Sequence, residues 1–187
     1  MKPGRKSPSA VRILAGRLKG KRLDVPREAR PTSGRAREAL FDILQDSIVG
    51  GRVLDLFAGS GAVGLEALSR GAAEAVFVES DRRALDVNLS RCAVRAATVE
   101  VFGEDVRRAV DLLSREGRRF DLVFADPPYS RGLSALPGSV GDLVAPGGRL
   151  VIQTDSDEEA PEIAGLAAPA RRAYARNVFW LFERSGP

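Results

Sequence analysis

The stretch Val53-Leu54-Asp55-Leu56-Phe57-Ala58-Gly59-Ser60-Gly61-Ala62-Val63-Gly64 decides the fold of this chain. It begins as an apolar run typical of a buried strand, turns at glycines and continues with the composition of a helix. Glycines let the backbone turn tightly and approach a ligand closely, while the first amides of the following helix are free to bind it. Residues 59–64 also read G-x-G-x-x-G, so this pattern alone fits nicotinamide cofactors as well as S-adenosylmethionine.

Along the chain from this stretch onward, strand-like runs alternate with helix-like segments. This alternation predicts βαβ units and a parallel sheet. After Pro146-Gly147-Gly148, two close runs at about 169–175 and 177–183 indicate a hairpin instead. We therefore expect a Rossmann-like α/β fold whose mostly parallel sheet ends in an antiparallel hairpin. The expected parallel strands are residues 52–57, 75–79, 98–102, 121–125 and 149–153.

The N-terminal segment is basic, in contrast to the rest of the chain. Residues 1–40 hold twelve Lys and Arg against three acids, a net charge of +9, whereas the remainder carries −5. Short apolar positions mixed with glycines over residues 11–31 predict an extended or hairpin-like arm. A helix is expected from Thr32 or Ser33 to Gly50-Gly51. We predict an RNA-contacting arm of residues 1–31 and a second unit of residues 32–187; a solubilising tail is the alternative for the first ten residues.

Composition excludes several classes of function. The chain has 187 residues, 44% of them hydrophobic, which is enough for one core of ordinary size. It contains no histidine, so the usual zinc-binding sets and the Ser-His and Cys-His catalytic pairs are excluded. The single cysteine, Cys92, lies on a helical pattern, which argues against covalent attack on a cytosine ring. We expect a monomer that needs no metal ion.

The hydropathy of the chain bears on its location. No apolar run reaches the roughly 18 to 20 residues that cross a bilayer. The basic N-terminus is not followed by the apolar stretch of a signal peptide. We therefore expect a cytoplasmic protein that does not contact a membrane.

Four acids follow one another at intervals of about one βα unit. The steps are 24 residues from Asp55 to Glu79, 26 to Asp105 and 21 to Asp126. Each acid should therefore lie near the carboxyl end of a parallel strand, where open α/β sheets bind ligands. Asp55 can hold the amides of the glycine turn or reach the cationic amino-acid end of S-adenosylmethionine, whereas it would repel a pyrophosphate. This acid favours S-adenosylmethionine as the cofactor.

The other acids have both a ligand-binding and a structural interpretation. Glu79 can accept hydrogen bonds from both ribose hydroxyls, or it is ordinary surface charge. Asp105 can accept from the adenine amino group, or it caps the helix that begins near Val106; the two interpretations have nearly equal weight. The cofactor site predicted from this half of the chain comprises Asp55, Phe57, Ala58, Gly59, Ser60, Gly61, Gly64, Glu79, Asp81, Glu104, Asp105 and Asp126.

The tetrapeptide Asp126-Pro127-Pro128-Tyr129 follows the strand at 121–125 and is the most specific feature of the sequence. An exocyclic base amine is a poor nucleophile because its lone pair is delocalised into the ring. The Asp126 carboxylate and the carbonyl of Pro127, on a backbone made rigid by two prolines, can accept both amine hydrogens and direct the lone pair at a methyl donor. Tyr129 supplies a flat face for stacking the base. The alternative is a proline turn with a chance aromatic residue.

These residues resemble the class I S-adenosylmethionine-dependent methyltransferases that modify amino groups, and within them the bacterial 16S rRNA (guanine-N2)-methyltransferases of the RsmD type. The resemblance covers roughly residues 11–153. Its motifs, besides the tetrapeptide, are Arg30-Pro31-Thr32-x-x-Arg35-x-Arg37-Glu38-x-x-Phe41, Asp55-Leu56-Phe57-Ala58-Gly59-Ser60-Gly61 and Gly64-Leu65-Glu66-Ala67-Leu68-Ser69-Arg70-Gly71.

The resemblance implies a seven-stranded sheet, S-adenosylmethionine as cofactor and methyl transfer to guanine N2 in 16S ribosomal RNA or a small-subunit assembly intermediate. Asp126, Pro127, Pro128 and Tyr129 would be the catalytic residues, and Thr32, Arg35 and Glu38 would lie beside the cofactor or target pocket. The residues expected to contact RNA are Arg12, Arg17, Lys19, Arg22 and Arg30, for which generic surface charge is the alternative.

Three other functions are compatible with parts of the sequence. A DNA adenine-N6 or cytosine-N4 methyltransferase shares the tetrapeptide, but it usually needs a recognition domain that is not visible here. A nicotinamide-dependent oxidoreductase fits the glycine pattern and leaves residues 126–129 unexplained. A non-catalytic RNA-binding module would rely on the basic arm alone.

Overall fold

A seven-stranded sheet forms the centre of the protein in the computed structural model, which describes residues 11–26, 34–44, 48–128, 132–155, 158–174 and 177–186. The strand order is β5-β4-β3-β6-β7-β9-β8; β5 to β7 pair in parallel, and β9 pairs antiparallel with both β7 and β8. The predicted parallel sheet with an antiparallel end is therefore confirmed. The strands are β3 (Arg52–Leu56), β4 (Glu74–Val78), β5 (Val99–Phe102), β6 (Phe120–Ala125), β7 (Val144–Asp155), β8 (Ala170–Tyr174) and β9 (Asn177–Glu183).

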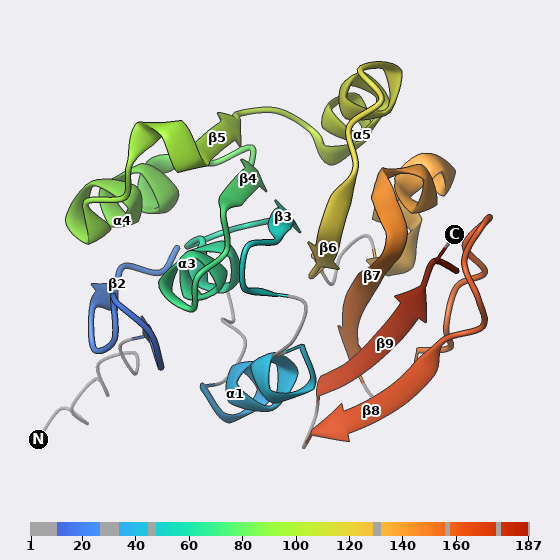
Figure 1. The fold of residues 1–187 in the computed structure, drawn as a ribbon, viewed down its shortest axis with the longest axis horizontal. Coiled ribbons are helices and arrows are strands. Elements are labelled where there is room, and N and C mark those ends of the chain that lie inside the picture. The colour runs from blue at the N-terminus through green and yellow to red at the C-terminus, as the bar shows by residue number, and fades with distance from the viewer. Residues whose placement is uncertain are drawn as a thin grey trace, which may run out of the picture.

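Helices cover both faces of this sheet (Figure 1). On one face, α1 and α3 pack on Leu122, Phe124 and Phe179, while α4 packs beside α3. On the other face, α5 and η3 cover the opposite side chains of the same strands, such as Val123 and Ile152. Alternating side chains of a strand point to opposite faces, so a parallel sheet of this kind is apolar on both. The helices are α1 (Gly34–Ile43), α3 (Ala62–Ser69), α4 (Arg83–Cys92) and α5 (Val106–Arg115), with short 3-10 turns η1 (Ala96–Thr98), η2 (Gly132–Ala135) and η3 (Gly138–Leu143).

The described part of the N-terminal arm packs on α3 and α4. Its two short strands, β1 (Val11–Arg12) and β2 (Arg22–Leu23), pair antiparallel. The hairpin-like arm is thus observed, although most of the segment between the two strands is turn. Ile13, Leu18 and Leu23 are buried in the same apolar cluster as residues of α3 and α4. The arm is therefore anchored by its apolar side chains, which leaves its basic side chains at the surface.

Strand β7 begins earlier than the sequence predicted. The expected strand was 149–153, but pairing with β6 already starts at Val144 and shifts register between Phe120 and Leu122. A methyl group on Gly148 would lie 2.9–3.1 Å from three backbone carbonyl oxygens, so only glycine fits in this irregular pairing. The Pro-Gly-Gly segment therefore lies inside the strand instead of preceding it.

The helix expected to run from Thr32 or Ser33 to Gly50-Gly51 is described only in part. The described α1 ends at Ile43, Leu44 follows as a bend, and residues 31–33 and 45–47 lie outside the described ranges. Within the described parts of the chain, no helix is long and apolar enough to cross a bilayer.

Candidate active site

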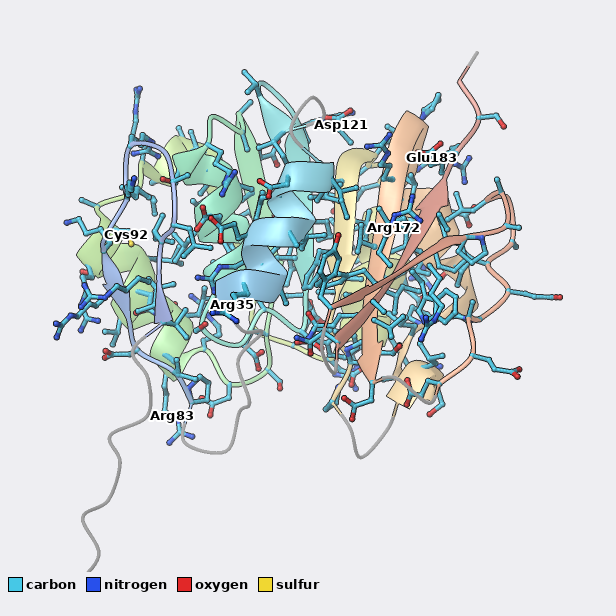
Figure 2. All side chains as sticks on the ribbon, turned by 90° about the horizontal axis from the view of Figure 1, so that it is seen from below. Arg35, Arg83, Cys92, Asp121, Arg172 and Glu183 are labelled. Carbon is cyan, nitrogen blue, oxygen red and sulfur yellow. The ribbon has the colours of Figure 1, made fainter. Side chains whose placement is uncertain are left out.

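The candidate site lies along the edge of the sheet where β3, β4, β5, β6 and β7 reach their carboxyl ends. Figure 2 shows Arg35 of α1 and Arg83 of α4 toward this end of the molecule, and Asp121, near the amino end of β6, toward the opposite end. Of the predicted acids, Asp55 lies within β3 near its end, and Glu79, Asp105 and Asp126 come after β4, β5 and β6. Open parallel sheets bind ligands at this edge because the loops there are not covered by the helices.

The glycine turn between β3 and α3 has a backbone that few side chains allow. Phe57, Gly59 and Gly61 have φ angles of 58°, 53° and 73°, all in the left-handed region. Gly61 precedes the first residue of α3, and a methyl group on it would lie 2.5 Å from Leu85 Cδ1. A methyl group on Gly64 would lie 2.3 Å from Cε1 of the buried Phe77. The turn and the first turn of α3 are therefore held tightly against the sheet.

Asp55 is buried beneath this turn. Its Oδ2 accepts a hydrogen bond of 2.9 Å from the amide of Gly64, in the first turn of α3. Burial is the largest cause that raises the pKa of Asp55, and the hydrogen bond from Gly64 opposes it; with smaller contributions from the charges of Asp126 and Glu79, the pKa reaches about 8. The prediction that Asp55 holds an amide of this segment is confirmed. The electrostatic effect of the two other acids also indicates that all three face a common region.

Glu79 connects the end of β4 to the glycine turn. Its Oε2 accepts 2.7 Å from the amide of Gly59, and its Oε1 accepts 2.8 Å from the amide of Asp81. The side chain is half-buried, so the interpretation as ordinary surface charge is wrong. Binding of ribose hydroxyls stays a prediction.

Asp105 caps α5, because its side chain accepts a hydrogen bond of 2.9 Å from the amide of Arg107. The capping interpretation is therefore confirmed, and contact with adenine stays a prediction. Asp81 is exposed, and hydrogen bonds from Arg83 hold the pKa of its carboxyl at about 2. Glu104, half-buried, precedes the cap.

Asp126 and Pro127 line a small cleft at the ends of β6 and β7. Both are half-buried, and Pro128 beside them is exposed. The amide of Gly132 donates a 3.0 Å bond to the Pro128 carbonyl, which places Gly132 close to Pro128. The remaining lining is polar and was not predicted from the sequence: Gly132, Gln153, Thr154, Asp155 and Glu158. Asp126, Pro127 and Pro128 thus follow β6 directly, as the sequence predicted, and Asp126 and Pro127 line a polar cleft there.

Asn88 of α4 is a second feature that the sequence did not identify. It is fully buried, and its Nδ2 donates to the Ser60 carbonyl at 2.9 Å and to the Asp24 carbonyl at 2.8 Å. Its Oδ1 accepts from the Asp24 amide at 2.8 Å. A single side chain therefore ties the arm to the glycine turn. The signal in the sequence was a polar residue in line with Leu85 and Cys92 on an otherwise buried helix face.

Glu66 anchors the arm from α3. Its carboxylate accepts bonds of 2.7 and 2.9 Å from the amides of Leu14 and Ala15, and 2.9 Å from Arg70 Nε. The buried Arg37 of α1 lies 3.9 Å away and donates to the Arg12 carbonyl. Burial lowers the pKa of Arg37, while Glu66 opposes the shift. This buried ion cluster fixes the arm against α1 and α3, so it has a structural role.

The remaining predicted residues are at the surface or outside the described ranges. Arg35 and Glu38 are exposed on α1, and their place beside a pocket stays a prediction. Thr32, Arg30 and Tyr129 lie outside the described residues. Of the residues predicted to contact RNA, the four that the structure describes are exposed: Arg12, Arg17, Lys19 and Arg22.

Two aromatic residues of β9 have structural roles. Phe179 is buried between the sheet and α1, and Trp180 packs on the opposite face and donates from Nε1 to Thr154 Oγ1 at 3.1 Å. Cys92 is buried at the end of α4, where burial raises the pKa of its thiol. Among the described residues, no group of three or more His, Cys, Asp or Glu side chains is arranged to hold a metal ion.

The sheet order, the glycine turn and the acids at the strand ends define a Rossmann-like class I methyltransferase fold. A solved structure of a putative methyltransferase from Escherichia coli, yhhF, has the same fold, with a TM-score of 0.79 and 33% identity; the match covers 95% of this chain and 99% of that chain. Residues 11–183 match the family model described as Conserved hypothetical protein 95. The chain belongs to this family.

Two curated relatives have similar sequences. Ribosomal RNA small subunit methyltransferase D of Escherichia coli is 41% identical over 135 residues, which cover 71% of this chain and 67% of that protein. The putative rRNA methyltransferase YlbH of Bacillus subtilis is 31% identical over 184 residues, which cover 94% of this chain and all of that protein. The family resemblance inferred from the motifs is confirmed.

Proposed function

We propose that this protein transfers a methyl group from S-adenosylmethionine to the exocyclic N2 of a guanine in small-subunit ribosomal RNA. The observation that carries the proposal is the position of Asp126 and Pro127 at the end of β6. There they line a cleft, and the charge of Asp126 contributes to the raised pKa of Asp55, which is buried beneath the glycine turn. The relatives named ribosomal RNA methyltransferases supply the substrate class.

The residues at the strand ends fit S-adenosylmethionine. The cofactor carries an ammonium group, two ribose hydroxyls and an adenine, and it supplies an electrophilic methyl group bound to a sulfonium. The close packing of Gly61 and Gly64 keeps the turn against the sheet. In this proposal the backbone of the turn binds the amino-acid end of S-adenosylmethionine. In this proposal Asp55 attracts the ammonium group, and Glu79 accepts hydrogen bonds from the ribose hydroxyls. Ionisation of Asp55 would become favourable once a cation lies beside it.

The chemistry asked of the protein is positioning. The Asp126 carboxylate and the Pro127 carbonyl accept the two hydrogens of the base amine, which orients its lone pair toward the methyl group. Tyr129 would hold the base by stacking. After transfer the amine nitrogen is positively charged, and the carboxylate that already accepts its hydrogen stabilises this charge until a proton is lost to solvent.

The basic arm supplies the affinity for RNA in this proposal. Arg12, Arg17, Lys19 and Arg22 are exposed on a segment that Glu66 and Asn88 hold against the catalytic unit. Contacts of Lys and Arg with phosphates position a nucleic acid without reading its sequence. Residues 1–31 therefore act as an RNA-contacting extension of the methyltransferase unit formed by residues 32–187.

Purified protein should transfer tritium from labelled S-adenosylmethionine to small-subunit RNA that lacks the modification. Asp126→Ala should reduce the turnover by at least about 100-fold, since it removes an acceptor used in the transition state. Asp142→Ala is the matched control, because Asp142 is an exposed acid in η3 whose ion pair with Arg184 spans 3.9 Å. An Asp126→Ala variant as active as the control would contradict the proposed role.

Three other results would identify the alternative functions. Labelling of adenine or cytosine in DNA in place of guanine in RNA would identify a DNA methyltransferase. Thermal stabilisation by NAD but not by S-adenosylhomocysteine would identify a nicotinamide enzyme. Salt-sensitive RNA binding without methyl transfer would leave only a binding module.

A further inference from the structure

The polar cleft beside Asp126 contains two acids that the proposed methyl transfer does not use. Asp155 ends β7, and Glu158 follows it in the next loop; both line the cleft together with Asp126 and Pro127. Carboxylates placed near another carboxylate repel it, so an additional acid at this position carries an electrostatic cost. A ligand that donates hydrogen bonds would offset this cost.

Glu158 is held close to the segment that follows the tetrapeptide. Its amide donates a 3.4 Å bond to the Asp155 carbonyl, which brings the loop back to the end of β7. A methyl group on Gly132 would lie 3.2 Å from Glu158 Oε1. Gly132 is itself bonded to the Pro128 carbonyl at 3.0 Å. The Glu158 carboxylate therefore lies near Gly132, in the lining of the cleft that Asp126 and Pro127 also line.

The bases that carry an exocyclic amine differ in the groups on either side of that amine. In guanine, N2 has the N1–H donor on one side and the N3 acceptor on the other. In adenine, N6 has the acceptors N1 and N7 as neighbours, and in cytosine N4 has the acceptor N3 and a C–H group. A carboxylate on the N1 side of the bound amine would therefore attract guanine, whereas a carboxylate facing N1 or N7 of adenine, or N3 of cytosine, would meet an acceptor. A second acid in this cleft is therefore suited to a guanine.

We propose that Glu158 is a specificity residue that accepts the N1–H of the target guanine while Asp126 and Pro127 hold its N2 amine. This inference rests on the proposed guanine methylation and adds the group that selects the base. The role requires contact with the base and not with the cofactor, so substitution of Glu158 should leave the affinity for S-adenosylhomocysteine unchanged.

The test compares two bases at the modified position of small-subunit RNA. Ligated RNA would carry either guanosine or 2-aminopurine riboside, which keeps the 2-amino group but has an unprotonated N1 acceptor. The wild-type protein should methylate guanosine at least about 100-fold more efficiently in kcat/KM, because the carboxylate repels the N1 lone pair of the analogue. Glu158→Gln should lower kcat/KM for guanosine by about 10-fold or more and narrow this ratio at least about tenfold, because an amide can donate to N1.

The ratio of the two substrates is insensitive to poor folding, which lowers both rates equally. Glu159→Gln is the matched control: Glu159 is the exposed neighbour, and its substitution should leave the ratio at the wild-type value. Glu158→Ala should lower the rate with guanosine and raise the rate with 2-aminopurine less than Glu158→Gln does, because it removes the repulsion of N1 but supplies no donor. A wild-type ratio in both Glu158 variants would overturn the assignment of Glu158. Absence of N2 methylation by the wild-type protein would instead overturn the proposed function.

Discussion

Replacing Asp55 by Asn should flatten the pH dependence of stability in the ligand-free protein. Burial raises the pKa of Asp55 from 3.8 to about 8, so the folded state keeps a proton that the unfolded state has lost between these values. The stability that this protonated group provides is complete below pH 4 and is lost as the pH rises to about 8. Asn cannot ionise, but its Oδ1 can still accept the Gly64 amide bond. The variant therefore removes the titration and keeps the contact.

The magnitude follows from the shift. Each pH unit between the two pKa values changes the free energy of unfolding by about 1.4 kcal/mol. From pH 5 to pH 7, the wild-type protein should therefore lose about 3 kcal/mol relative to Asp55→Asn. In a chain of 187 residues this corresponds to a relative fall in Tm of about 6 to 12 °C. Other groups titrate equally in both proteins, so the difference between the two curves isolates Asp55.

Thermal and urea unfolding at pH 5, 6 and 7 would measure this difference. The expected result is that the wild type loses stability relative to the variant by about 1.4 kcal/mol for each pH unit between pH 5 and pH 7. Parallel curves would refute the assignment of a raised pKa to Asp55. A wild type that gains stability over the variant with rising pH would show that Asp55 is stabilised as a carboxylate.

Three further substitutions test the packing and the surface. Gly64→Ala should destabilise the protein by about 1 to 3 kcal/mol in urea unfolding, because the added methyl group overlaps a buried ring. The control Gly34→Ala has open space around it and should be neutral or stabilising. Equal effects of the two substitutions would contradict the packing argument. Asn88→Leu should lower the free energy of unfolding by about 2 to 4 kcal/mol, because it leaves buried backbone groups unpaired. It should also increase proteolysis of the arm. Unchanged protection of the arm would show that Asn88 does not anchor it. The Arg17→Ala, Lys19→Ala double variant should weaken RNA binding about 10-fold at low salt in a filter-binding assay. It should also reduce the slope of log K against log salt concentration by about 2. A slope equal to that of the wild type would show that these two residues do not contact RNA phosphates.

The parts of the fold that follow local patterns could be predicted from the sequence. The strand at residues 52–56, the glycine turn and α3 are encoded in consecutive residues, and the hairpin of β8 and β9 has a short connection. The early start of β7 at Val144 was missed because Pro146-Gly147-Gly148 is typical of a loop. Glycine there instead allows an irregular strand to approach its neighbour, and this depends on the sheet and not on local sequence.

The candidate site divides in the same way. Asp55 and Asp126 could be predicted because each follows a strand pattern and lies in a motif with a chemical rationale. Asn88 could not, since its partners Asp24 and Ser60 are 64 and 28 residues away in the chain. Glu158 is one acid in an acidic stretch, and only the three-dimensional structure places its carboxylate beside Gly132. Long-range contacts of polar side chains leave no periodic pattern in the sequence.

The central claim is that the end of β6 presents a guanine amine of small-subunit RNA to S-adenosylmethionine. Mass-spectrometric mapping of methylated guanines in ribosomal RNA, from cells with and without this protein, tests that claim most directly. We expect one N2-methylguanine in the small-subunit RNA to disappear without the protein and to return with the wild type but not with Asp126→Ala. An unchanged set of N2-methylguanines in the small-subunit RNA would contradict the claim.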